Sequence, residues 1–141
     1  RIRIEFEESG AMVFTDSMWI EFIINQIMSN AIKYCPSEDG CIHIETKKKD
    51  NEAILTITDN GIGISRADLG RVFEKSFTGA NGRVAKTSTG MGLYLCDKLC
   101  RRLGHGITIA STEGQGTSVR ITFAADSYYQ VVNEEGSEGD E

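Results

Sequence analysis

The sequence from Ile54 to Gly63, Ile-Leu-Thr-Ile-Thr-Asp-Asn-Gly-Ile-Gly, constrains the fold more than any other stretch of the chain. Its apolar residues and threonines follow the pattern of a buried strand, which is predicted to end at Asp59-Asn60-Gly61, a strong turn signal. A carboxylate therefore stands at the tip of a strand, beside glycines whose backbone can approach a ligand closely. Since Asp-Asn-Gly alone is most often an ordinary turn, a binding site must be argued from several segments together.

A second glycine-rich segment, Ser88-Thr89-Gly90-Met91-Gly92, stands directly before a predicted helix over residues 93–103. Two glycine-rich turns, one with a carboxylate and one at a helix start, indicate a ligand that contains phosphate. The dinucleotide fingerprint would need glycine where Leu95 stands, and the chain contains no P-loop sequence, so both of those sites are excluded. The range between the two turns, 64–89, is predicted to form a long lid.

Length and charge favour one domain at residues 1–125 followed by an acidic, disordered tail at 126–141. The tail holds six acidic residues and no Lys or Arg, which accounts for the whole net charge of −6. The remaining body is formally neutral, with 15 acidic and 15 basic residues, which argues against a nucleic-acid partner. Four cysteines without a Cys-x-x-Cys spacing predict reduced thiols, and Cys96 and Cys100 share a helix face as small buried residues.

The order of predicted elements favours an α+β fold. We expect a two-layer α/β sandwich in which a mixed, mostly antiparallel sheet is covered on one face by about three helices. Alternation at the N-terminus predicts a strand whose Ile2, Ile4 and Phe6 face inward. The other predicted elements are a short strand at 12–14, a helix at 18–34 capped by Asp16 or Ser17, a strand at 41–46 followed by a polar turn at 47–52, the central strand to Thr58, a short helix at 66–73 capped by Ser65, the helix at 93–103 closed by Gly104, and strands at 106–110 and 117–123.

The helix at 18–34 carries a narrow polar stripe on an otherwise apolar surface, formed by Gln26, Asn30 and Lys33 with Tyr34 beside them. A polar group buried without a partner costs roughly 1–3 kcal/mol, so these side chains need water or a ligand. The pattern leaves two interpretations open, a solvated stripe on a partly exposed helix and the wall of a pocket.

Four segments, taken in order, resemble the N, G1, G2 and G3 boxes of one ATP-binding fold. They are residues 30–34 (Asn-Ala-Ile-Lys-Tyr), 59–63 (Asp-Asn-Gly-Ile-Gly), 90–93 (Gly-Met-Gly-Leu) and 114–117 (Gly-Gln-Gly-Thr). This Bergerat-type fold is shared by sensor histidine kinases, gyrase-type ATPases, Hsp90 and MutL. Residues 71–77 resemble the histidine-kinase F box. The sequences of 73–79 and 88–95 are similar to those of small membrane-associated, antibiotic-sensing kinases of Gram-positive bacteria.

The resemblance implies ATP and Mg²⁺ as cofactors. Asp59 would accept a hydrogen bond from the adenine amine, Asn30 would ligate Mg²⁺, and Lys33 would neutralise phosphate charge, which makes Asn30 and Lys33 the implied catalytic residues. Two cations of the lid, Arg83 and Lys86, are suggested contacts of the γ-phosphate. The implied cofactor-binding set is Asn30, Lys33, Tyr34, Asp59, Gly61, Gly63, Gly90, Met91, Gly92, Leu93 and Thr117.

The reaction favoured by the resemblance is phosphate transfer. Hydrolytic relatives have glutamate where Gln26 stands, and an amide cannot act as a carboxylate base. Neither His43, expected at the surface of a strand, nor His105, expected to cap or pack at a helix end, is expected to accept phosphate.

The implied activity is therefore that of a protein-histidine kinase fragment, which donates the γ-phosphate to a histidine of a separate dimerisation domain of the same parent. A response regulator would follow in a two-component system, with no nucleic acid and no direct membrane contact by this fragment. The domain would be cytoplasmic and its parent would lie in the cell membrane. The alternatives are an ATPase of the wider superfamily and a non-catalytic nucleotide-binding regulatory module.

Overall fold

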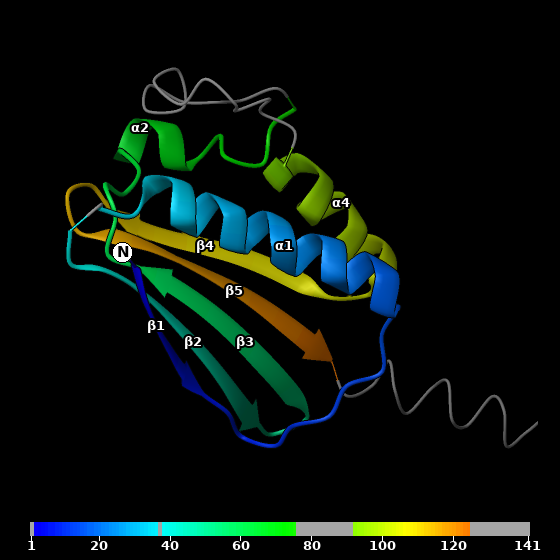
Figure 1. Ribbon diagram of the computed structural model, residues 1–141. Coiled ribbons are helices and arrows are strands. Elements are labelled where there is room, and N and C mark those ends of the chain that lie inside the picture. Colours follow the sequence, from blue (N-terminus) through cyan, green and yellow to red (C-terminus); the bar gives the residue numbers. More distant parts are fainter. Residues whose placement is uncertain (1, 37, 76–91, 125–141) are drawn as a thin grey trace, which may run out of the picture.

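The computed structural model describes residues 2–36, 38–75 and 92–124, which form a sheet with helices layered on one of its faces (Figure 1). The strand order is β1-β2-β3-β5-β4, where β1 and β2 are parallel and the other neighbours are antiparallel. The predicted two-layer α+β sandwich is thus confirmed. The elements are β1 (Ile2–Glu7), α1 (Ser17–Tyr34), β2 (Gly40–Lys49), β3 (Glu52–Asp59), α2 (Arg66–Leu69), α4 (Gly92–Leu103), β4 (Gly106–Thr112) and β5 (Gly116–Ala124).

The core lies between the sheet and helices α1 and α4, which also pack against each other. Burial raises the pKa of the Cys96 thiol to about 12 and that of Cys100 to about 11, so both stay protonated and act as small hydrophobes, as predicted. No helix among the described residues is both long and apolar enough to cross a membrane. The buried core residues are Ile23, Ile27, Ala31, Ile42, Ile57, Cys96, Cys100, Val119, Ile121 and Phe123.

The start of α1 and the end of α4 are capped by the residues that the sequence predicts. The Asp16 carboxylate accepts hydrogen bonds from the backbone N–H groups of Met18 and Trp19, each at 3.0 Å, which makes Asp16 the N-cap of α1. At the end of α4, Gly104 adopts a φ of 77°, and the N–H of His105 donates to the carbonyl of Cys100 at 2.8 Å. This is the Schellman arrangement, in which a left-handed glycine ends the helix.

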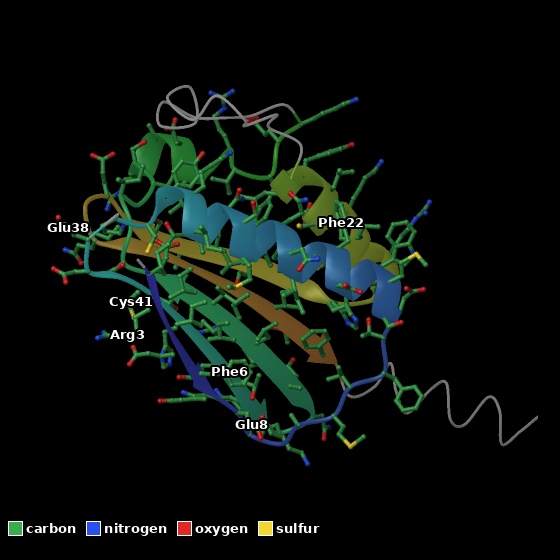
Figure 2. The ribbon with its side chains drawn as sticks, in the orientation of Figure 1. Arg3, Phe6, Glu8, Phe22, Glu38 and Cys41 are labelled. Atoms are coloured by element: carbon green, nitrogen blue, oxygen red, sulfur yellow. The ribbon has the colours of Figure 1, made fainter. Side chains whose placement is uncertain are left out.

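The prediction that Ile4 and Phe6 of β1 face the core is wrong. These side chains are 55% and 62% exposed, and only Ile2 of that set packs against the core. The reason is the position of β1 at the sheet edge, away from α1, which packs over β3 (Figure 2). The alternating pattern correctly places Ile2, Ile4 and Phe6 on one face of β1, but the layer of helices does not extend far enough to cover that face.

One predicted strand and two element boundaries also differ from the structure. Residues 12–14 form no strand, because the chain there crosses the end of the sheet on its way to α1, and Met12 is 90% exposed (Figure 1). The expected polar turn at 47–52 shortens to two residues, since Lys47, Lys48 and Lys49 pair with β3. Helix α2 ends at Leu69, with Gly70 as its C-cap, and does not continue to residue 73; its predicted cap, Ser65, is confirmed.

His105 is buried and packs inside the fold, as expected. Its Nε2 lies 2.8 Å from the Thr15 hydroxyl, and its ring meets Phe123 edge-on at a centroid distance of 4.7 Å. Nδ1 of this ring has no hydrogen-bond partner among the described residues. Burial without a second partner lowers the pKa of His105 below its ordinary value of 6.5.

The folded domain is therefore expected to lose stability in acid through His105. The unfolded chain binds this proton at a higher pH than the folded state, so the contribution is intact above 6.5 and falls as the pH drops toward the lowered folded pKa. Urea unfolding on both sides of that pH should show a steeper acid loss in the parent protein than in His105→Gln, which does not titrate. An equal slope in the two proteins would contradict this role of His105.

Candidate nucleotide-binding site

Asp59 is the last residue of β3, where it pairs in register with Thr117 of β5. Its Oδ1 accepts a hydrogen bond from the backbone N–H of Gly61 at 2.8 Å. Desolvation raises the pKa of the half-buried Asp59 carboxyl, and hydrogen bonds from the backbones of Gly61 and Thr117 oppose the rise without cancelling it. The two backbone hydrogen bonds therefore hold the carboxylate in position, but they offset only part of the desolvation of its charged form.

The turn after Asp59 is fixed by main-chain hydrogen bonds to three other elements. The N–H of Ile62 donates to the carbonyl of Tyr34 at the end of α1, at 3.2 Å. The carbonyl of Ile62 accepts from Gly114, in the turn between β4 and β5, at 2.7 Å. The N–H of Asn60 donates to the carbonyl of Cys41 in β2 at 3.2 Å. The end of β3, the end of α1 and the β4–β5 turn therefore form one connected region.

Two of the predicted glycines are required by this packing. A Cβ atom at Gly61 would lie 2.3 Å from the carbonyl oxygen of Tyr34. Gly63 has a φ of 71°, and a Cβ atom there would lie 2.3 Å from the carbonyl oxygen of Thr112. Because both obstacles are backbone atoms, a larger residue would displace the turn. The glycines therefore have a role in the fold itself, and their contact with a ligand stays a prediction.

Two further residues support the site and were missed in the sequence. The Ser111 hydroxyl accepts from the N–H of Ile64 at 2.8 Å and lies 2.9 Å from the Thr117 hydroxyl. Asn60, read only as a turn residue, accepts from the N–H of Cys41 through its side chain at 2.8 Å. The Asp-Asn-Gly turn signal in the sequence points to Asn60. Ser111 has no such signal, because only the register of β4 with β5 pairs it with Thr117.

One residue of the polar stripe of α1, Gln26, lies beside the start of α4. Gln26, Asn30 and Lys33 are all half-buried, and a Cβ atom at Gly92 would lie 2.8 Å from Oε1 of Gln26. The Lys33 ammonium lies 5.8 Å from the centre of the Tyr34 ring. Half-burial is compatible with both interpretations of the stripe, so the pocket wall stays a prediction.

The structure brings the predicted residues together in two groups joined by α1. The first group lies around the turn after β3 and consists of Tyr34, Asp59, Gly61, Gly63 and Thr117. The second group is Gly92, at the start of α4, with Gln26 of α1 next to it. Asn30 and Lys33 stand on α1 between Gln26 and Tyr34, and Leu93 is half-buried in the first turn of α4. The predicted Gly90, Met91, Arg83 and Lys86, and the tail at 126–141, lie outside the described residues.

Residues 15–127 match the family model described as histidine kinase-, DNA gyrase B-, and HSP90-like ATPase. The chain belongs to this ATPase family. The family match supports ATP as the nucleotide of this domain, and the resemblance is confirmed at the level of the family.

Relatives of this ATPase domain include sensor kinases of Gram-positive bacteria. It is 46% identical to the sensor protein kinase GraS of Staphylococcus aureus (strain N315) and 37% identical to the sensor histidine kinase YxdK of Bacillus subtilis, in each case over 111 residues and 79% of this chain. The match spans only 32% of GraS and 34% of YxdK, about a third of each relative.

Solved structures agree with the family. The mycobacterial sensor histidine kinase MprB superposes with a TM-score of 0.78 at 25% identity, over 87% of this chain and 83% of that one. The catalytic domain of histidine kinase ThkA, in a nucleotide-free form, gives a TM-score of 0.73 at 22% identity, over 88% and 79% of the two chains, and shows the shared fold.

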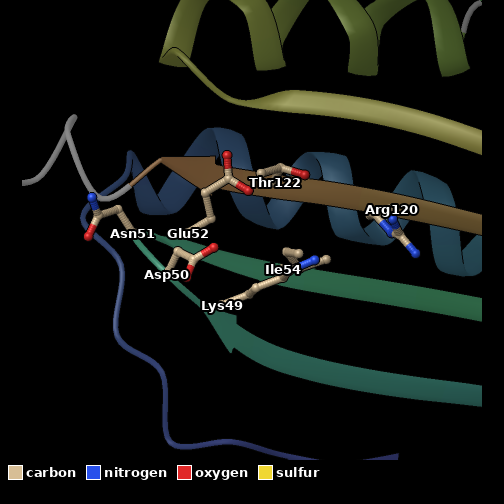
Figure 3. A pocket seen from close by; sticks show the side chains of 7 residues that line it. All are labelled: Lys49, Asp50, Asn51, Glu52, Ile54, Arg120 and Thr122. Carbon is tan, nitrogen blue, oxygen red and sulfur yellow. The ribbon is translucent and has the colours of Figure 1, made fainter.

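A separate cavity lies at the other end of β3 from Asp59 in this ATPase domain (Figure 3). It has a volume of about 450 Å³ and is shallow and mostly polar. Charged side chains of both signs surround it, and it includes none of the residues of the four boxes. It is therefore distinct from the nucleotide site; its lining residues are Lys49, Asp50, Asn51, Glu52, Ile54, Arg120 and Thr122.

Proposed function

We propose that this domain binds Mg–ATP and donates the γ-phosphate to a histidine of a separate dimerisation domain, as the catalytic part of a sensor histidine kinase. The observation that carries the proposal is the half-buried Asp59 carboxyl at the end of β3, which accepts the Gly61 N–H at 2.8 Å and stands in register with Thr117. A further donor would stabilise the charged form, and the exocyclic amine of adenine is such a donor. Guanine presents a carbonyl oxygen at that position, which a carboxylate repels, so the pocket should select adenine.

The phosphate end of the site would lie between α1 and the start of α4. The first N–H groups of a helix have no partner within the helix and favour anions, and α4 begins at Gly92, beside Gln26 of the polar stripe. Lys33 supplies a positive charge on the same side of α1. The half-buried Asn30 offers an amide oxygen, a hard donor that suits Mg²⁺. When bound, Mg²⁺ would neutralise phosphate charge and take its remaining ligands from phosphates and water.

The side chains around the site favour transfer over hydrolysis. Gln26, next to Gly92, has no carboxylate with which to activate water. Of the two histidines, His105 is buried and His43 lies in β2 close to two glutamates, so neither is placed as a phosphate acceptor. The acceptor is then a histidine on the parent's dimerisation domain, and a response regulator receives the phosphate next. Such a domain would work in the cytoplasm beneath a membrane-anchored parent.

Calorimetric titration of ATP, ADP and GTP, each with Mg²⁺ and with EDTA, tests the binding step directly. We expect adenine-selective binding and an ATP affinity that responds to Mg²⁺. Equal binding of GTP and ATP would contradict the role of Asp59. Absence of any nucleotide binding by the folded domain, both alone and with the upstream helical domain attached, would contradict the proposal as a whole.

Incubation with labelled ATP and a separately supplied helical domain that contains the acceptor histidine tests the transfer step. We expect label on that domain, in a form that is stable in base and labile in acid, as a phosphohistidine is. Release of inorganic phosphate at the same rate with and without the acceptor domain would favour the ATPase alternative.

Asn30→Asp is expected to weaken Mg-dependent phosphate transfer by about 10- to 100-fold, while the thermal midpoint changes little. The substitution keeps the size of the side chain but adds a negative charge where the phosphates would lie. Ser29→Asp adds the same charge one residue away, at an exposed position of α1, and serves as the matched control. Equal transfer rates and an unaltered Mg²⁺ requirement in Asn30→Asp would remove this residue from the metal site.

A further inference from the structure

The face of β1 and β2 that is turned away from the helices carries a row of polar side chains. Residue 42 of β2 is in the core, so Cys41, His43 and Glu45 project to the opposite face. The register pairs them with Arg3, Glu5 and Glu7 of the parallel strand β1. Arg3 and Cys41 are visible on this face in Figure 2. None of these residues belongs to the nucleotide site.

Three members of the row converge on one point. Nε2 of His43 lies 3.6 Å from Oε2 of Glu45 and 4.0 Å from Oε2 of Glu7. One ligand atom from each of the three side chains lies within 4.8 Å of the other two. His43 and Glu45 are partly buried, with side chains 33% and 24% exposed, whereas Glu7 is 65% exposed. Two strands thus hold an imidazole and two carboxylates in a common cluster.

We propose that Glu7, His43 and Glu45 form a binding site for a divalent transition metal of the Zn²⁺ type. Zinc takes imidazole nitrogen and carboxylate oxygen at about 2.0–2.2 Å in a tetrahedral arrangement, which requires ligand atoms about 3.4 Å apart. The distances of 3.6 and 4.0 Å are close to that value, and rotamer changes of the two glutamates would supply the remaining contraction. Water takes the fourth position. The imidazole selects against Mg²⁺ and Ca²⁺, which prefer oxygen ligands only.

The neighbouring charges are compatible with the metal. Lys47 lies 3.1 Å from Oε1 of Glu45, which leaves Oε2 directed at His43. Since the Lys47 side chain is 70% exposed, its ion pair contributes little and does not compete strongly with a divalent cation. Glu5 is the register partner of His43 and accepts a hydrogen bond from the Cys41 thiol at 3.2 Å. Its carboxylate is therefore already bonded to Cys41 and is not counted among the metal ligands.

The bound metal would join the edge strand to the rest of the sheet. Glu7 is the last residue of β1, whereas His43 and Glu45 belong to β2, which β3 supports on its other side. A ligand that binds only the folded state raises its stability. Zn²⁺ should therefore stabilise the domain without any nucleotide, through a site separate from that of Mg–ATP.

Calorimetric titration of Zn²⁺ into EDTA-stripped, nucleotide-free protein tests the site, together with the thermal midpoint before and after Zn²⁺. We expect one equivalent to bind and the midpoint to rise. His43→Gln and Glu45→Gln should each weaken binding by about tenfold or more and abolish the rise. Glu8→Gln, an exposed neighbour of Glu7, is the charge-matched control and should behave as the parent protein does. All these positions are at the surface or partly exposed, so circular dichroism should show folded variants.

Three results would overturn the proposal. One is the absence of Zn²⁺ binding by the folded parent protein, and another is unchanged affinity in His43→Gln. The third concerns Cys41, which is half-buried on the same face. If Cys41→Ser abolishes binding while His43→Gln retains it, thiolate chemistry accounts for the metal. An intense sulfur-to-metal charge-transfer band with Co²⁺ as the probe would report the same outcome independently.

Discussion

Asp59→Asn is expected to lower ATP affinity by about 100-fold or more, because the carboxylate is the acceptor that we propose for the adenine amine. A hydrogen bond to a charged group is worth roughly 1.5–3 kcal/mol, and the amide would place a second donor against the first. The fold should persist, since asparagine is nearly isosteric and its Oδ1 can still accept the Gly61 N–H that lies at 2.8 Å. Calorimetric titration of ATP measures the loss, and circular dichroism checks the fold.

Asp50→Asn is the matched control for this experiment. It removes the same charge from the opposite end of β3, in the exposed β2–β3 turn. Asp50 has a φ of 53°, a conformation that asparagine tolerates well, so the control should be at least as stable as the parent. Its ATP affinity should be unchanged. If folded Asp59→Asn also binds ATP with the parent's affinity, the adenine pocket has been placed at the wrong residue.

Gly116→Ala is expected to reduce the free energy of unfolding by about 3 kcal/mol or more. Gly116 has a φ of 139°, and a Cβ atom there would lie 2.0 Å from the carbonyl oxygen of Asp59 and 3.1 Å from the Cα of Asn60. Both obstacles are backbone atoms of the central strand and its turn, so a rotamer change cannot relieve the overlap. Urea unfolding at equilibrium measures the effect.

Gly114→Ala, in the same hairpin turn, separates backbone conformation from steric overlap. Gly114 has a φ of 83°, but a Cβ atom there would meet no atom of the described residues within 4 Å. Alanine at this position should therefore cost only about 1 kcal/mol, the usual penalty of a left-handed residue. The two variants should differ by at least about 2 kcal/mol in unfolding free energy. Equal losses would mean that the hairpin adapts to the added methyl group, and that the close approach to Asp59 is not a constraint.

The elements of the fold were predictable wherever a local signal marked them. The cap at Asp16, the left-handed Gly104 and the Asp-Asn-Gly turn each depend on a few consecutive residues, and the structure confirms them. The orientation of Ile4 and Phe6 was not predictable, because it depends on how far α1 extends across the sheet, which is a tertiary property. Pairing with β3, and not residue type, likewise extends β2 through Lys47–Lys49.

The site was predictable to the extent that its residues lie in contiguous segments. Asp59, Gly61 and Gly63 form one such segment, and the structure places it against the end of α1. Ser111 could not be predicted, since its importance appears only when the register of β4 and β5 brings it to 2.9 Å from Thr117. The roles assigned to Asn30 and Lys33 depend on a ligand and stay predictions.

The turn at Ile62 has a consequence for how such domains diverge. Its N–H and carbonyl both make main-chain hydrogen bonds, whereas its side chain is 43% exposed. Any residue supplies those two groups except proline, which lacks the N–H, so the turn after Asp59 places almost no demand on the side chain at this position. Mutation there can be retained by drift, or selected for contacts with another molecule, while the geometry around Asp59 is inherited intact.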